Sequence, residues 1–128
     1  MNLKFALGRM VILLSSIGVL AFSCEEQKPD LIGCWTNAYE EGYNIYKGCS
    51  AQSFSPSHFR QVYDFRDDGI VNYLVLHPAD AHYMQEAKWV YVGSKNEVHI
   101  RNLQTNQLIV KLKYTTIDSE TIEIVKVQ

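Results

Sequence analysis

The sequence has no excess of positive charge. It contains 12 Lys and Arg against 14 Asp and Glu, for a formal net charge of −2, and no segment gathers basic side chains. Proteins that bind nucleic acid, or that dock on anionic lipid through charge, need such a patch. We therefore expect no nucleic-acid partner and no membrane binding through surface charge.

The sequence also lacks an apolar run long enough to span a bilayer. The longest, residues 10–22, has thirteen residues, whereas a spanning helix needs roughly twenty. Lys4 and Arg9 precede this run, and small residues stand at its end. A short basic region, an apolar stretch of this size and small residues near a cleavage point are typical of a secretory signal. We expect residues 1–23 to be a cleaved signal peptide.

The end of this segment, LAFSC at residues 20–24, resembles a lipobox. In signals of that kind the chain is cut before a lipid-modified cysteine, which would be Cys24. The usual leucine stands one place early here, at Leu20, as in looser Bacteroidetes-type versions, where acidic residues such as Glu25 and Glu26 mark export to the surface. The resemblance implies a lipid anchor in the bacterial envelope, in the outer membrane, and multiple acyl chains give stable anchoring. A plain cleaved signal is the alternative.

Cysteine is scarce, with three in the whole chain. If Cys24 carries lipid, only Cys34 and Cys49 remain. Two cysteines in an exported chain suggest one disulfide. It would close a loop of about 15 residues and contribute roughly 3 kcal/mol in the chain-entropy model. A pair of free thiols is the alternative, because the spacing does not show that the two approach.

A helical period is missing from residues 31–128. Apolar and polar residues instead alternate in short segments between turns, as in half-buried strands. Asp68-Gly69 separates two of these segments and predicts a tight hairpin, because glycine accepts a positive φ. The predicted strands are 31–37, 58–65, 70–76, 87–93, 97–102, 108–116 and 121–127, with long connections at 40–57 and 77–86. The second connection has room for a helical turn.

Seven or so short strands at regular spacing favour an all-β antiparallel meander that closes into a barrel or sandwich. Removing the signal leaves 105 residues, enough for one domain. Residues 24–30 are polar and include Pro29. The predicted organisation is a signal peptide at 1–23, a lipidated tether at 24–30 and one β-domain at 31–128.

Residues 31–35, LIGCW, resemble the Gly-x-Trp signature of lipocalin-like barrels. Residues 65–69, FRDDG, resemble the F-x-x-D-G hairpin of small bacterial lipocalin-like domains, and Trp89 and the paired last strands extend the pattern over nearly all of the domain. The resemblance implies a barrel of about 7–8 strands that binds a small apolar ligand or lipid.

Glycine and tryptophan at these positions also have physical roles of their own. Gly33 allows the backbone to bend at a barrel end where a side chain would clash. Trp35 can plug the barrel floor while its indole N–H finds a partner. We interpret Gly33, Trp35, Asp68 and Gly69 as structural.

No catalytic motif is present. No serine lies in a Gly-x-Ser-x-Gly elbow, and a hairpin turn explains the paired carboxylates of residues 67–68. Residues His77, Asp80, His82 and Glu86 match no metal-binding spacing, so a solvated loop is the favoured interpretation. We therefore expect no enzymatic activity, no metal and no cofactor.

Aromatic residues are the most suggestive remaining feature. Tyr39, Tyr43 and Tyr46 lie in or beside the first long connection, where a barrel would have its mouth, and tyrosine offers ligands an apolar face with a polar tip. Ordinary surface tyrosines are the alternative. The leading hypothesis is a binder of a small apolar ligand, which requires a cavity of a few hundred Å³. The second is an envelope protein-interaction module, which requires a solid core and an apolar patch on its loops.

Overall fold

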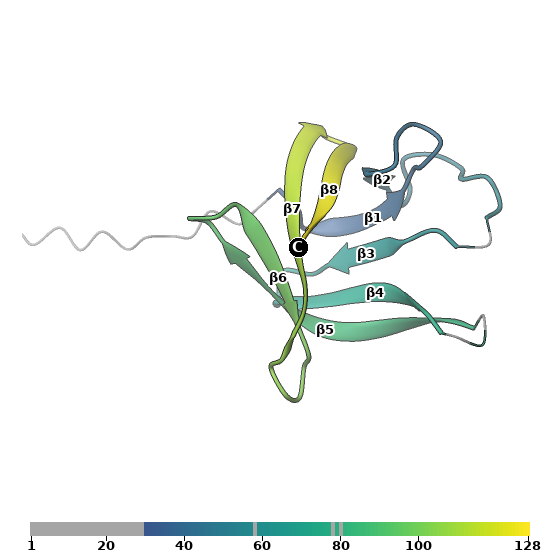
Figure 1. Ribbon diagram of the computed structural model, residues 1–128. Helices are drawn as coiled ribbons and strands as arrows, with labels where there is room; N and C mark the ends of the chain where they lie inside the picture. The colour runs from purple at the N-terminus through teal and green to yellow at the C-terminus, as the bar shows by residue number, and fades with distance from the viewer. Residues whose placement is uncertain (1–29, 58, 78, 80) are drawn as a thin grey trace, which may run out of the picture.

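The computed structural model describes residues 30–57, 59–77, 79 and 81–128. In these ranges the chain forms eight β-strands and no helix. The strands close into an antiparallel barrel in the order β1-β2-β8-β7-β6-β5-β4-β3 (Figure 1). This confirms the predicted all-β barrel of 7–8 strands. The strands are β1 (Gly33–Asn37), β2 (Ile45–Gly48), β3 (Val62–Phe65), β4 (Ile70–Leu76), β5 (His82–Val92), β6 (Glu97–Arg101), β7 (Leu108–Asp118) and β8 (Thr121–Val127).

The first two strands depart from a simple meander. Strands β3 to β8 pair with their neighbours in chain order, but β1 lies between β2 and β3 and is antiparallel to both. Residues 49–61 therefore carry the chain back along the length of β1 before β3 begins. Strand β2 falls inside 40–57, which the sequence analysis wrongly predicted as loop. It has only two apolar residues, Ile45 and Tyr46, so it shows no strand period.

The second long connection is shorter than predicted. Strand β5 begins at His82 rather than at residue 87, and it pairs with β4 from Ile70↔Lys88 to Leu76↔His82. Residues 82–86 are mostly polar, but the backbone of β4 offers them a continuous ladder, and this pairing outweighs their weak strand propensity. Strand β3 begins four residues later than predicted, at Val62.

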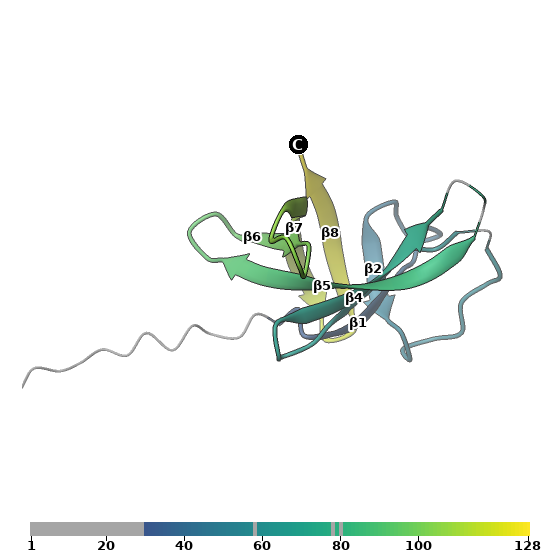
Figure 2. The same cartoon turned by 90° about the horizontal axis from the view of Figure 1, so that it is seen from below.

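The connections alternate between two ends of the barrel. We call the end with residues 30–32 and the turns at 66–69, 93–96 and 119–120 the closed end. The end with loop 38–44, the β4–β5 connection and loop 102–107 is the open end. Strands β4 and β5 cross β7 and β8 at a steep angle (Figure 2), as expected of strongly tilted strands in a small barrel.

The apolar core fills the barrel on the side of the closed end. Its largest fully buried side chains are Leu31, Phe65, Val71, Val98, Ile100, Leu112 and Ile122. Two buried indoles lie beside them. Trp35 Nε1 donates to the Leu31 carbonyl at 2.7 Å, and Trp89 Nε1 donates to the Arg66 carbonyl at 2.9 Å. Trp35 is thus buried with its indole N–H bonded, and its expected role as the plug of the barrel floor stays a prediction.

Two glycines have conformations that a side chain would strain. Gly69 has φ +81° in the β3–β4 turn, where Asp68 Oδ1 accepts a hydrogen bond from the Ile70 N–H at 3.0 Å. The predicted hairpin is confirmed. Gly33 has φ +137°, but a Cβ there would approach nothing closer than Trp35 Nε1 at 4.0 Å. The backbone conformation, rather than a clash, requires glycine at this position.

The Cys34–Cys49 disulfide is present, with the two Cα atoms 5.4 Å apart. The Cys49 N–H also donates to the Cys34 carbonyl at 3.0 Å. The bond ties the start of β1 to the end of β2, so it fixes the pair of strands that departs from the meander.

The predicted signal peptide, the lipid-attachment cysteine Cys24 and residues 24–29 of the tether lie outside the described residues. Within the described part of the chain, no helix has the length and apolarity needed to cross a membrane.

Candidate binding cavity

A cavity of about 460 Å³ opens at the open end of the barrel. Tyr39, Tyr43 and Tyr46, the three tyrosines singled out by the sequence, all line it. Its other lining residues come from β1, β3, β8 and the segments beside them: Asn37, Asn44, Phe59, Gln61, Tyr63, Ile124, Val125 and Lys126. The structure therefore brings the candidate tyrosines to one hollow.

Unequal strand lengths create this cavity. Strand β2 pairs with β8 only as far as Ile45↔Glu123, and one further hydrogen bond joins the Ile124 N–H to the Asn44 carbonyl at 2.9 Å. Beyond it, β8 pairs only with β7. On the other side β3 pairs with β4 no further than Tyr63↔Tyr73. Because these strands are short, the barrel wall near the open end consists of loops and side chains, which do not fill the interior.

Stacked aromatic rings form the floor of the cavity. Tyr63 is 3% exposed and Tyr46 is 8% exposed, and their ring centroids are 5.8 Å apart. Tyr63 also stacks on Phe65 of the core at 5.7 Å and on Tyr73 at 6.5 Å. Tyr63 thus contacts both the packed core and the hollow above it. From the sequence, its place in the alternating pattern of a strand indicated only that its side chain would be part of the core.

The hydroxyls of the floor tyrosines are available to a ligand. Among the described residues neither the Tyr46 nor the Tyr63 hydroxyl has a hydrogen-bond partner, yet no fully buried side-chain polar atom there lacks one. Both hydroxyls therefore reach accessible space. Burial raises the pKa of Tyr46 to about 12 and raises the pKa of Tyr63 as well, so both are protonated donors at neutral pH.

Arg60 holds the rim of the cavity. Its guanidinium forms two hydrogen bonds with the Glu40 carboxylate, at 2.6 and 2.9 Å, and donates to the carbonyls of Asn37 at 2.7 Å and Ser55 at 3.0 Å. It also lies 4.5 Å from the ring centroid of Tyr39. The hydrogen bond from Arg60 lowers the pKa of Glu40 to about 2. No local pattern in the sequence indicated this pair, since its members are 20 residues apart.

Two side-chain amides close the gaps where strand pairing ends. Asn37 Nδ2 donates to the carbonyls of Tyr43 and Ile45, both at 3.1 Å. Gln61 Nε2 donates to the carbonyl of Leu74 at 3.0 Å, one register step beyond the last β3–β4 pair. These bonds preserve the shape of the cavity wall without a continuous ladder.

A second hollow, of about 480 Å³, lies at the closed end. Its lining is mostly polar, and its one aromatic residue, Trp35, is buried and bonded to Leu31. It is lined by Asp30, Ile32, Trp35, Thr116, Asp118 and Ser119. Without open aromatic faces it offers an apolar ligand little contact.

The histidines and carboxylates of residues 77–86 do not gather. Glu86 Oε1 accepts a hydrogen bond from Arg66 at 3.3 Å, and the His82 ring lies edge-on to Phe59 at 5.5 Å. Asp80 is outside the described residues. In the ranges that the structure describes, no three His, Cys, Asp or Glu side chains are grouped to hold a metal ion.

No protein family, curated protein sequence or solved structure matches this chain.

Proposed function

We propose that this protein is a lipid-anchored binding protein of the bacterial envelope whose lipocalin-like barrel takes a small, largely apolar ligand at its open end. The observation that carries the proposal is the cavity of about 460 Å³ above an aromatic floor. Ligand sites typically have volumes of roughly 300–1,000 Å³ and combine apolar walls with a few polar groups.

The lining supports a ligand with a flat apolar part. The Tyr46 and Tyr63 rings are held by their neighbours and need no reordering when a ligand stacks on them. The rim is held by Arg60 through loop 38–44. A site arranged in advance loses less conformational entropy on binding, so even a small ligand retains useful affinity.

The described part of the chain begins at the end of the barrel opposite the cavity. Asp30, the first described residue, lies at the closed end, where it lines the second hollow with Ser119. A tether that enters there leaves the open end unobstructed.

A neutral fluorescent probe, N-phenyl-1-naphthylamine, tests the binding site. We expect its fluorescence to rise on binding and Asn44→Trp to weaken binding roughly tenfold, because the indole fills the cavity. The matched control is Asn72→Trp, which places the same ring on the outer face of β4, opposite Glu86. Binding that survives Asn44→Trp, or that is lost equally in both variants, would contradict the proposal.

Native mass spectrometry of the detergent-extracted full chain tests the anchor. We expect a mass that begins at Cys24 and includes acyl chains, and the loss of membrane association in Cys24→Ser. A chain that retains residues 1–23, or that begins at Cys24 without lipid, would refute the anchor without affecting the cavity.

A second candidate function, protein interaction, is favoured by apolar side chains exposed around the open end. Tyr43 is 88% exposed and Leu76 is 47% exposed, and Tyr83 and Met84 are also exposed. Leu76 of β4 and Met84 of β5 leave the outer face of these strands partly open. A photo-crosslinking residue at Leu76 in cells should yield one discrete adduct if this function is correct, while the same residue at Lys88 should yield none.

A further inference from the structure

We propose that the cavity selects ligands that carry an anionic group, and that Lys126 is the partner of that group. The inference rests on the proposed function, because it names the chemistry of the ligand for the same site.

The position of Lys126 breaks the pattern of its own strand. Along β8, Ile122 and Ile124 face the interior and are buried, and Lys126 is the next residue on that face, opposite Leu112 of β7. Val125 faces outward and is 38% exposed. The alternation thus inverts where β8 reaches the cavity: a valine stands at the outward position, and an exposed lysine follows the buried isoleucines on the face that lines the cavity mouth. A local break of this kind in an otherwise consistent pattern is expected at functional sites.

The charges around the cavity leave Lys126 uncompensated. Glu40 is bonded to Arg60, and Glu41 Oε2 lies 3.2 Å from Lys47 Nζ. Within the described residues, Lys126 forms no ion pair and no carboxylate lines the cavity. The cavity therefore has one net positive charge, which lies at its exposed mouth.

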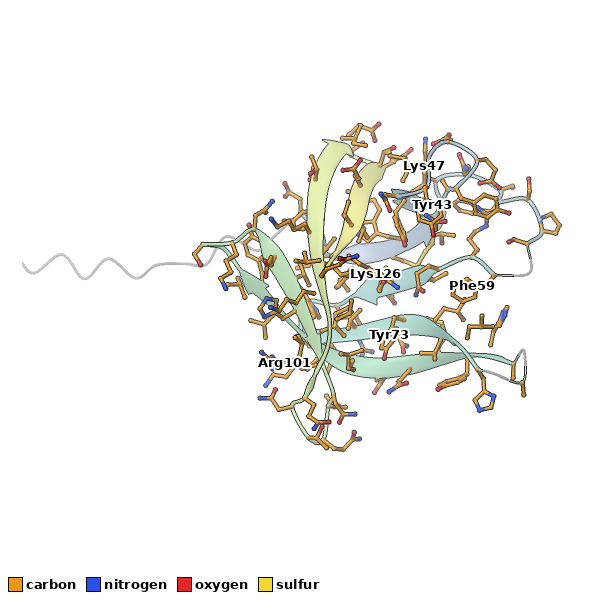
Figure 3. All side chains as sticks on the ribbon, viewed as in Figure 1. Tyr43, Lys47, Phe59, Tyr73, Arg101 and Lys126 are labelled. Atoms are coloured by element: carbon orange, nitrogen blue, oxygen red, sulfur yellow. A yellow bond between two sulfur atoms is a disulfide. The ribbon has the colours of Figure 1, made fainter. Side chains whose placement is uncertain are left out.

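The remaining lining suits a molecule with two unlike parts. Lys126 lies near the C-terminal end of β8 (Figure 3), and the cavity whose mouth it lines has an aromatic floor. An apolar body stacked on Tyr63 would leave a carboxylate or phosphate near the ammonium group. The Tyr46 hydroxyl, a protonated donor at neutral pH, adds a hydrogen bond.

Three naphthalene derivatives of matched shape test the inference by displacing N-phenyl-1-naphthylamine. They are 2-naphthoate, 2-naphthalenemethanol and 2-naphthylmethylammonium. We expect the anion to bind roughly two- to fivefold more tightly than the alcohol at low salt, and the cation to bind most weakly. The ratio of anion to alcohol affinity should fall to about one in Lys126→Met and should be kept in Lys126→Arg.

The matched control is Lys113→Met, which removes the same charge from the outward face of β7, opposite Val125. Lys113→Met should keep the ratio of anion to alcohol affinity, because the preference for the anion comes from the charge at Lys126 and not from the total charge of the protein. Equal affinities of anion and alcohol in the natural protein, or an unchanged ratio in Lys126→Met, would overturn this inference while probe binding persists. Failure of the neutral probe to bind would overturn the proposed function as well.

Discussion

Raising the pH above 10 is expected to destabilise the barrel through the tyrosines at the floor of its cavity. Burial raises the pKa of Tyr46 from 10 to about 12, and it raises the pKa of Tyr63 in the same direction. Above pH 10 the unfolded chain releases these protons while the folded chain retains them. The unfolded state then binds fewer protons, so the free energy of unfolding falls as the pH rises. Below pH 10 both states are protonated and the effect is absent.

The magnitude follows from the size of the shift. Each pKa unit corresponds to about 1.4 kcal/mol, so Tyr46, whose pKa is raised to about 12, removes about 3 kcal/mol of stability between pH 10 and 12. Urea unfolding at several pH values from 8 to 11, with the disulfide intact, measures this slope. Tyr46→Phe should lower the slope above pH 10 by about 1.4 kcal/mol per pH unit.

Tyr43→Phe should lower the slope less than Tyr46→Phe does, because burial is a larger cause of the raised pKa of Tyr46 than the neighbouring Tyr43 is. Tyr63→Phe should act like Tyr46→Phe. Absorbance near 295 nm should also show phenols that ionise above their usual range, because burial raises the pKa of Tyr46, Tyr63, Tyr73 and Tyr114. If Tyr46→Phe and the natural protein had the same slope, the floor tyrosines would not be as buried as the structure indicates.

Three further perturbations follow from the fold. Replacing both Cys34 and Cys49 by Ser should lower the free energy of unfolding by about 3 kcal/mol, because a loop of about 15 residues is released, and thermal unfolding with and without reductant measures this. Gly33→Ala should lower the free energy of unfolding by about 1–3 kcal/mol, since alanine is strained at φ +137°. Urea unfolding measures this change, and an unchanged free energy of unfolding would contradict the backbone conformation of Gly33. Arg60→Met should raise amide hydrogen exchange in loop 38–44 and weaken N-phenyl-1-naphthylamine binding, whereas Arg101→Met, far from the rim contacts, should change neither.

The sequence predicted the strands whose inner face is core. In β6 and in β8 as far as Ile124 the buried apolar side chains recur at every second residue, and the expected strands at 97–102 and 121–127 differ from the observed ones by at most one residue. The turn at Gly69 was also predictable, because its backbone conformation requires glycine.

The failures lie in strands that contribute to the open end. Strand β2 and the first half of β5 face a hollow or solvent rather than packed core, so burial imposes no regular alternation there. Their positions depend on pairing with partners distant in sequence, such as Tyr46↔Ile122 between β2 and β8. Local patterns contain no information on that pairing.

The candidate site was predictable only in part. The tyrosines of loop 38–44 and β2 stood out because aromatic residues in a polar connection are unusual. Arg60 and Gln61 had no local signal, because their partners Glu40 and Leu74 are far away in the chain. Lys126 did have a local signal, which is the inverted alternation at the end of β8. This signal can be interpreted only when the strand register shows which face of β8 is the inner one.

The measurement that tests the central claim most directly is a ¹⁵N-resolved NMR titration of the folded protein with N-phenyl-1-naphthylamine. Binding in the cavity predicts saturable amide shifts concentrated at residues 37–46, 59–63 and 124–126, which surround the open end. Shifts centred on residues 30–32 and 116–119 at the closed end, or no saturable shifts at all, would contradict it.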